Sequence, residues 1–289
     1  MDLMIRTHSV RAGDLCFEVA MCGSGPKFAL LLHGFPEHHV SWRYQLQYLA
    51  SLGYTVWAPN MRGYGNTTRP YHTGAYALPH LLADITHLIQ VAGNRKTLLV
   101  GHDWGGTLAW YYAALYPQML TGIAVFNAPH PIVAEQSVTN PRQSGRWWYI
   151  PTMLTPGIGD LMLADGGAYA CFKRHNIVVD AHTRKAYLDN LRSPGAIRAM
   201  TDWYRAYLWP ETKWLPEHRA AYWPIRVPVL NFAGGSDLVL DTSMLASLDR
   251  FAPDIETYVF PYLHHWSNQE APHECNHLIS NWLARKRIA

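Results

Sequence analysis

The sequence has few charged residues and no long apolar run. Asp, Glu, Lys and Arg make up only 16% of the 289 residues, and the formal net charge is +3. These charges are scattered without a basic block, which argues against electrostatic binding of nucleic acid or of an anionic membrane surface. No apolar run reaches the roughly 18 residues of a membrane-spanning helix, and the first residues lack the apolar region of a signal peptide.

Cysteine is also scarce. The four cysteines lie far apart and form no C-x-x-C pair, which argues against a disulfide framework and against a zinc ribbon. We therefore expect a cytoplasmic protein in a reducing compartment. The sequence leaves the oligomeric state open, with a homodimer as one alternative.

Apolar residues, by contrast, make up 49% of the chain, enough for a sizeable core at this length. Short apolar segments alternate with helical patterns such as residues 77–92. Several of these segments show no polar alternation, which indicates strands that are covered on both faces. The pattern predicts an α/β fold, with a mostly parallel sheet flanked by helices. The predicted strands are residues 17–21, 28–32, 55–58, 97–101, 122–126, 228–233 and 257–261.

One long region has no predicted strand. Residues 132–223 combine helical patches with many Trp and Tyr residues and repeated Pro and Gly breaks. We interpret this region as a helical cap inserted between two parts of one core domain. The first part of the core is then residues 1–131, and the second part is residues 224–289.

A sharp turn that carries an acid follows the predicted strand 97–101. Residues 101–106 read GHDWGG, and a helical pattern continues after them. This is the strand–turn–helix context of the G-x-S-x-G nucleophile motif, with Asp103 in place of serine. The alternative is that Asp103 only caps the following helix.

Two further residue types follow later strands in the order that such nucleophiles require. Asp237 comes shortly after the strand 228–233, and His265 follows the strand 257–261. Asp241 is the alternative acid, although it lies further from the strand end. Near the N-terminus, the segment HGFP at residues 33–36 predicts an oxyanion hole made by the backbone N–H groups of Phe35 and Trp104.

With these motifs the chain resembles the α/β-hydrolase-fold epoxide hydrolases of the soluble type, in which the nucleophile is an aspartate. The resemblance implies two cap tyrosines that hold and protonate the epoxide oxygen. Tyr204, within the segment DWYR, matches one of them, and Tyr149 is the choice for the other, with Tyr169 and Tyr207 as alternatives. The motifs that carry the resemblance are HGFPE (33–37), MRGYG (61–65), GHDWGG (101–106), NAPHP (127–131) and HHW (264–266).

The choice of aspartate limits the chemistry. A carboxylate that attacks a saturated carbon gives an ester, which a water molecule activated by His265 can hydrolyse, whereas serine would give an ether. Asp103 therefore predicts substitution at an epoxide, a haloalkane or a haloacid, with Asp237 orienting His265. A dehalogenase is the alternative function, although Phe35 replaces the asparagine that often binds the halide. The non-enzymatic alternative is a catalytically silent binding module.

The expected ligands are a small hydrophobic epoxide and water, without cofactor or metal. No carboxylate or cysteine lies at a zinc-site spacing from the histidines that follow the HGFP segment. His264 is expected to narrow the pocket or to shift the pKa of His265, and Glu37 either braces the oxyanion loop or lies in solvent. The expected lining residues of the substrate pocket are Phe35, His38, Trp42, Trp104 and Trp148.

Overall fold

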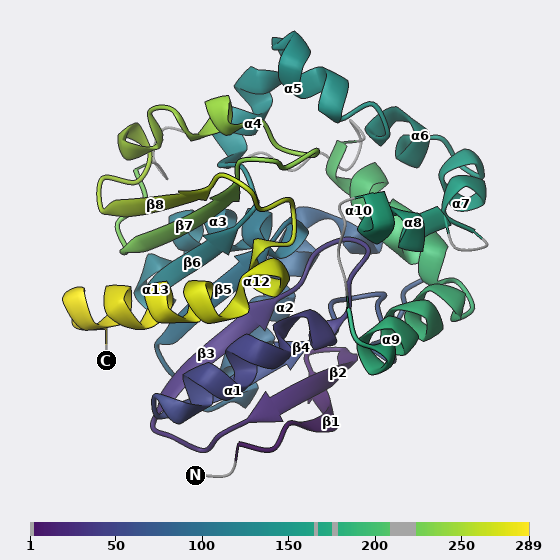
Figure 1. Cartoon of the computed structure of the whole chain (residues 1–289). Coiled ribbons are helices and arrows are strands. Elements are labelled where there is room, and N and C mark those ends of the chain that lie inside the picture. The colour runs from purple at the N-terminus through teal and green to yellow at the C-terminus, as the bar shows by residue number, and fades with distance from the viewer. Residues whose placement is uncertain (1–2, 165–166, 175–178, 209–223, 289) are drawn as a thin grey trace.

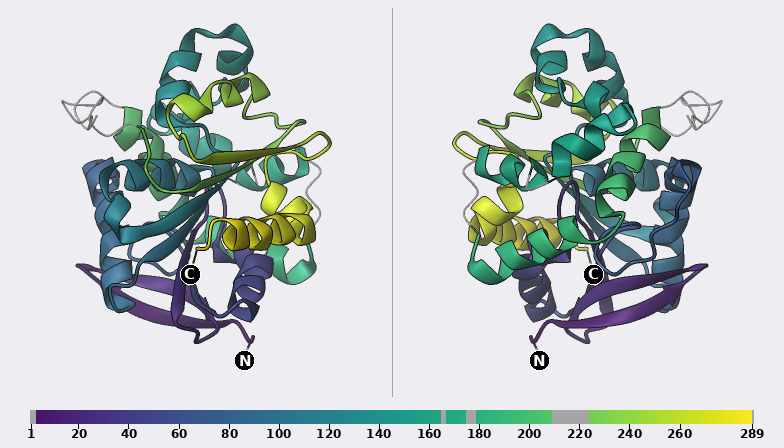
Figure 2. Two further views of the ribbon diagram at one scale, coloured as in Figure 1. Left: turned by 90° about the vertical axis from the view of Figure 1, so that its left-hand side faces the viewer. Right: turned by 90° about the vertical axis from the view of Figure 1, so that its right-hand side faces the viewer.

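The computed structural model describes residues 3–164, 167–174, 179–208 and 224–288, and these residues form one mixed sheet with helices on both faces (Figures 1 and 2). The strand order is β1-β2-β4-β3-β5-β6-β7-β8. The strands from β4 to β8 in that order pair in parallel, whereas β2 pairs antiparallel with both β1 and β4. The strands are β1 (Arg6–Ala12), β2 (Leu15–Cys22), β3 (Lys27–Leu32), β4 (Tyr54–Pro59), β5 (Thr97–His102), β6 (Leu120–Phe126), β7 (Val229–Gly234) and β8 (Ile255–Phe260).

The central strands are buried on both faces, as their apolar runs predict. In β3, Phe28 and Leu30 face the cluster that contains α2 (Leu78–Val91) and α3 (Trp104–Leu115). The intervening Ala29 belongs to the opposite cluster. That second layer is formed by α1 (Arg43–Ser51) and α13 (Pro272–Arg285). The α/β-hydrolase fold with a mostly parallel sheet is thus confirmed.

Strand β1 was not predicted. It pairs only with β2 at the edge of the sheet, and most of its side chains are exposed. Its sequence, RTHSVRA, therefore lacks the apolar run by which the other strands are predicted.

A group of helices lies to one side of the sheet, beyond the ends of the strands (Figure 1). It comprises the helices between β6 and β7, so the described part of the predicted cap contains helices and no strand. Its predicted end at residue 223 falls outside the described residues, and the domain limits stay a prediction. None of the helices in the described residues has the length and apolar character needed to span a membrane. The helices are α4 (Pro131–Gln136), α5 (Pro141–Arg146), α6 (Ile150–Leu154), α7 (Ile158–Leu163), α8 (Gly167–Arg174), α9 (Ala181–Arg192) and α10 (Ala196–Leu208).

Candidate active site

Asp103 lies in the turn between the fully buried strand β5 and helix α3. Its φ of 51° is a strained conformation for a residue with a side chain. The turn is tight, because a Cβ on Gly105 would lie 2.1 Å from the carbonyl oxygen of Leu32. Asp103 makes no side-chain hydrogen bond that caps α3. The carboxylate therefore faces the interior of the site, where its Oδ1 accepts the N–H of Phe35 at 2.8 Å.

His265 lies between two carboxylates. Its Nδ1 is 2.9 Å from Oδ2 of Asp237, and its Nε2 is 3.5 Å from Oδ2 of Asp103. Asp237 follows β7, and its Oδ1 accepts the N–H groups of Val239 and Leu240, which fixes the carboxylate. The structure therefore brings together the three side chains that the sequence predicts as nucleophile, base and acid.

The alternative acid, Asp241, lies elsewhere. Its carboxylate pairs with Arg146 and accepts the N–H of Ser243. Asp237, rather than Asp241, is thus the carboxylate that contacts His265.

The opposite charges of His265 and of the two carboxylates, Asp103 and Asp237, stabilise one another. Burial disfavours each charged form, but the charge of His265 and its hydrogen bonds keep the pKa of Asp103 and of Asp237 below the ordinary value. Burial also opposes protonation of His265, yet the two carboxylates raise its pKa from 6.5 to about 10. In the resting protein His265 is therefore an imidazolium between two carboxylates.

Two residues to which the sequence analysis gave no role support Asp237 and the loop that carries His265. Asn127, which follows β6, donates from Nδ2 to Oδ2 of Asp237 at 2.9 Å and to the carbonyl oxygen of His264 at 3.0 Å. Glu270 accepts the N–H groups of His264 and Trp266, on either side of His265. The position of Asn127 directly after an apolar strand was a usable signal, whereas nothing in the sequence marks Glu270.

His264 takes part in that support. Its Nδ1 lies 2.9 Å from Oε2 of Glu270, so its ring is held by the same glutamate that accepts the N–H groups on either side of His265. It does not line either of the cavities described below. Glu37, by contrast, is fully buried and accepts the N–H of Gly34 at 3.0 Å, so it braces the HGFP loop instead of lying in solvent.

Tyr149 and Tyr204 face Asp103 from the cap. Their ring centroids are 6.3 Å apart, and both residues line the same two cavities as Asp103. Burial, with the nearby Tyr149 and Asp103, raises the pKa of Tyr204 well above its ordinary value, so its hydroxyl keeps its proton. The alternative Tyr169 lines neither cavity and packs on Phe172.

The remaining alternative, Tyr207, lines only the larger cavity. Its hydroxyl lies 2.9 Å from that of Tyr111. Among the four candidate tyrosines, Tyr149 and Tyr204 are thus the two that border both cavities beside the carboxylate.

Two largely apolar cavities of about 250 and 470 Å³ meet at Asp103, Tyr149, Tyr204 and Val239. Of the predicted pocket residues, Phe35 and Trp148 line the smaller one and Trp104 lines the larger one. The other lining residues of the smaller cavity are Pro36, Arg146, Met153, Met162, Leu163, Gly167, Ala170, Leu238, His265 and Trp266. Those of the larger cavity are Thr107, Tyr111, Pro129, Pro131, Ala134, Glu135, Val138, Ser144, Trp147, Ile150, Pro151, Tyr207, Leu208 and Leu240.

The prediction that His38 and Trp42 line the pocket is wrong, because neither residue borders these cavities. The chain turns away from the site after Pro36 and enters the short 3₁₀ helix His39–Trp42. Trp42 is fully buried in the α1–α13 layer, with its ring 5.8 Å from that of Phe126.

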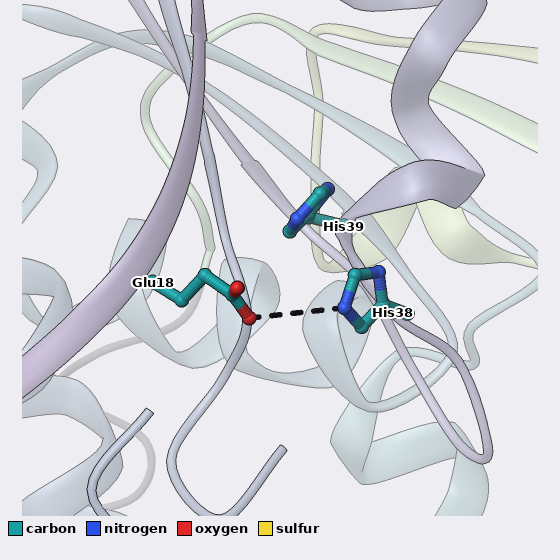
Figure 3. Close-up of side chains that lie close together, drawn as sticks. All are labelled: Glu18, His38 and His39. Carbon is teal, nitrogen blue, oxygen red and sulfur yellow. Dashed lines mark ion pairs between the residues drawn. The ribbon is translucent and has the colours of Figure 1, made fainter. Parts of the chain in front are cut away.

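His38 belongs to a separate group with Glu18 and His39, whose potential ligand atoms lie within 4.8 Å of one another (Figure 3). Such a set could in principle hold a metal ion. However, Nδ2 of Asn60 contacts both Oε2 of Glu18 and, at 2.8 Å, Nε2 of His38. An amide thus already bridges the two groups, and a cation would have to displace it. Hydrogen bonding is therefore sufficient to account for this group.

Comparisons with known proteins agree with this geometry. A model of the alpha/beta hydrolase fold family matches residues 30–272. Epoxide hydrolase 3 of Xenopus tropicalis is 31% identical, over 98% of this chain and 76% of the relative. Epoxide hydrolase 4 of Homo sapiens is 30% identical over the same shares. The AB hydrolase superfamily protein YfhM of Bacillus subtilis is 29% identical, over 96% of this chain and 98% of the relative.

A solved structure shares the fold. The crystal structure of Bacillus megaterium epoxide hydrolase in complex with an inhibitor matches with a TM-score of 0.86 at 23% identity, over 96% of this chain and 100% of the other. The chain therefore belongs to the α/β-hydrolase fold family and, within it, to the epoxide hydrolases, which are hydrolases that act on ether bonds.

Proposed function

We propose that this protein converts a small hydrophobic epoxide into a vicinal diol through a covalent ester on Asp103. The observation that carries the proposal is the position of Tyr149 and Tyr204. Both border the cavities at the carboxylate of Asp103, which has His265 at 3.5 Å on its other side. A nucleophile, two proton donors and a base are thus arranged around one apolar space.

In the first step, Asp103 attacks one epoxide carbon and the ring C–O bond breaks. The oxygen takes a proton from Tyr149 or Tyr204, because a phenol is a stronger acid than the alcohol that forms, and the raised pKa of Tyr204 keeps its proton in place until this step. The ester has no charge, so His265 loses one of the two carboxylates that hold its proton. That proton replaces the one lost by the tyrosine, and His265 becomes a neutral base.

In the second step, His265 removes a proton from water, which attacks the ester carbonyl. The N–H of Phe35, already within hydrogen-bond distance of Oδ1, stabilises the developing oxyanion, and that of Trp104 is the predicted second donor. When the tetrahedral intermediate collapses, the remaining proton of the attacking water passes from the new carboxyl group to the leaving alkoxide, and the diol leaves. The regenerated carboxylate of Asp103 again faces a protonated His265, so the cycle closes with one water consumed.

The test compares epoxide opening with dehalogenation, the alternative for the same nucleophile. Wild type should convert styrene oxide to its diol and release no halide from 1-haloalkanes. The Tyr149→Phe/Tyr204→Phe double variant should lose at least about a hundredfold in kcat/KM for the epoxide, because both proton donors are removed. Tyr207→Phe is the matched control, since it lines only the larger cavity, and it should retain activity. Halide release without diol formation would replace the proposal by dehalogenation.

A further inference from the structure

Thr107 borders the larger cavity one helical turn after the nucleophile, and the catalytic steps proposed above give it no part. It lies in α3, where its N–H donates to the carbonyl oxygen of Asp103 at 2.9 Å. From residue 97 to residue 113, every residue is buried except Asp103 and Thr107. The strand, turn and helix thus keep exposure at only two side chains, a carboxylate and a hydroxyl, and both border this cavity.

The hydroxyl of Thr107 makes no hydrogen bond to any residue that the structure describes. A threonine inside a helix commonly donates to the carbonyl oxygen four residues earlier. Thr86 and Thr201 do so in this chain, each at 3.2 Å. Since Thr107 does not, its hydroxyl is available to a molecule in the cavity.

The other hydroxyl groups among the described lining residues of the larger cavity have partners or a proposed role. Those of Tyr111 and Tyr207 lie 2.9 Å from each other. That of Ser144 donates to the carbonyl oxygen of Asn140 at 3.1 Å. The remaining two belong to the tyrosines proposed to hold the epoxide oxygen. Thr107 therefore carries the hydroxyl that a second polar group of the substrate can reach without displacing a protein contact.

The spacing of Asp103 and Thr107 limits where that polar group lies on the substrate. Four residues of α-helix rise about 6 Å, and helical side chains lean back toward the N-terminus. A reacting carbon lies about 3 Å from its nucleophile, and a hydrogen bond between two oxygens spans about 2.8 Å. These two lengths take up most of the separation, so the polar group is attached close to the epoxide ring.

We propose that Thr107 is a specificity-determining residue that binds a hydroxyl group on the carbon next to the epoxide ring. A hydroxyl fits because it can donate to the threonine oxygen or accept its proton. Without this partner, a hydroxyl buried in a largely apolar cavity would cost free energy. The favoured substrates are thus epoxides with a hydroxyl on the adjacent carbon and an apolar chain beyond it. The inference rests on the proposed function, because it names the substrate class of the same site.

The test compares 1,2-epoxyhexan-3-ol with 3-methyl-1,2-epoxyhexane, in which a methyl group replaces the hydroxyl. The measured quantity is the ratio of the two kcat/KM values, hydroxyl compound over methyl compound. Thr107→Val keeps the shape of the side chain and removes its hydroxyl, so this ratio should fall about tenfold. Thr107→Ala also lacks the hydroxyl and should show the same fall, whereas Thr107→Ser should keep the ratio within about twofold of wild type. An unchanged ratio in Thr107→Val and Thr107→Ala would overturn the proposal.

Ser144→Ala is the matched control. It removes another hydroxyl from the same cavity, but one that already donates to Asn140, so the ratio should keep its wild-type value. An equal fall in this control would mean that any loss of polarity in the cavity changes the selectivity, and the specific role of Thr107 would fail.

Binding of the products separates this inference from the proposed function. Calorimetry gives the dissociation constants of hexane-1,2,3-triol and 3-methylhexane-1,2-diol without turnover. Thr107→Val should weaken binding of the triol about tenfold relative to the diol. If wild type converts neither epoxide, the proposed function fails, and these constants still decide the role of Thr107. If wild type forms the products and neither ratio moves in Thr107→Val, only that role is refuted, and if it neither forms nor binds them, both proposals fail.

Discussion

At the scale of the residue, the site depends on one strained aspartate. Asp103 has a positive φ in a tight turn. Gly105 in this turn lies so close to the end of β3 that a Cβ on it would be 2.1 Å from the carbonyl oxygen of Leu32. The sequence could predict Asp103, Asp237 and His265, because each is a reactive residue type placed directly after an apolar strand. It could not predict their protonation, which depends on His265 lying 2.9 and 3.5 Å from two carboxylates.

That protonation makes stability depend on pH. The pKa of His265 is about 10 in the folded protein and near 6.5 when unfolded, so its contribution is complete below pH 6.5 and is lost as the pH rises to about 10. The loss approaches about 1.4 kcal/mol per pH unit within this window. The stability advantage of wild type over His265→Gln should therefore shrink between pH 6.5 and 10, as measured by urea unfolding. A constant difference across that window would contradict the charge state assigned to His265.

At the scale of the element, helix α5 joins the cap to the loop that carries Asp237, the proposed acid. Gln143 donates to the carbonyl oxygen of Val239 at 2.8 Å and accepts the N–H of Asp241 at 2.7 Å. Arg146 pairs with Asp241 and donates to the carbonyl oxygen of Asp237. Since Tyr149 follows only three residues later, this contact links the position of one proton donor to that of the acid.

Arg146→Met should therefore affect both stability and catalysis. We expect a loss of about 1 kcal/mol in the free energy of unfolding, since the ion pair is partly exposed, and a fall in kcat/KM of about tenfold from misplacement of Tyr149. Arg142→Met is the control on the same helix, where the side chain is exposed, and it should change neither. Chemical unfolding and initial rates on styrene oxide measure both effects. Equal behaviour of the two variants would refute this role of α5.

Strand β1 and the segment after Pro36 show which parts of the fold the sequence could not predict. Strand β1 was missed because an exposed edge strand carries no apolar run. His38 and Trp42 were misplaced because closeness in sequence to Phe35 does not give the direction of the chain after Pro36. A one-dimensional pattern predicts which strand a loop follows, whereas the path of the loop depends on the packing of η1 (His39–Trp42) and α1 under the sheet.

At the scale of the whole molecule, the site lies where the cap meets the ends of the strands. The alternation of strands and helices along the chain could be predicted. Neighbouring parallel strands need a connection that crosses over the sheet, so apolar strand segments are separated by helical segments in the sequence. The shape of the two cavities could not, because it arises from side chains of α5, α6 and α10 packing against the loops after β3, β5 and β7. The sequence therefore predicted which candidate reactive residues lie together and left open the shape of the substrate that the cavities would accept.

The most direct test of the central claim is the intact mass of the His265→Gln variant after incubation with styrene oxide. Asp103 can still attack the epoxide in this variant, but no base remains to activate water. The account predicts a protein heavier by one substrate molecule, with the added mass on the peptide that contains Asp103, and no such species with Asp103→Ala. An adduct on Asp103→Ala, or full turnover by His265→Gln without any adduct, would contradict it.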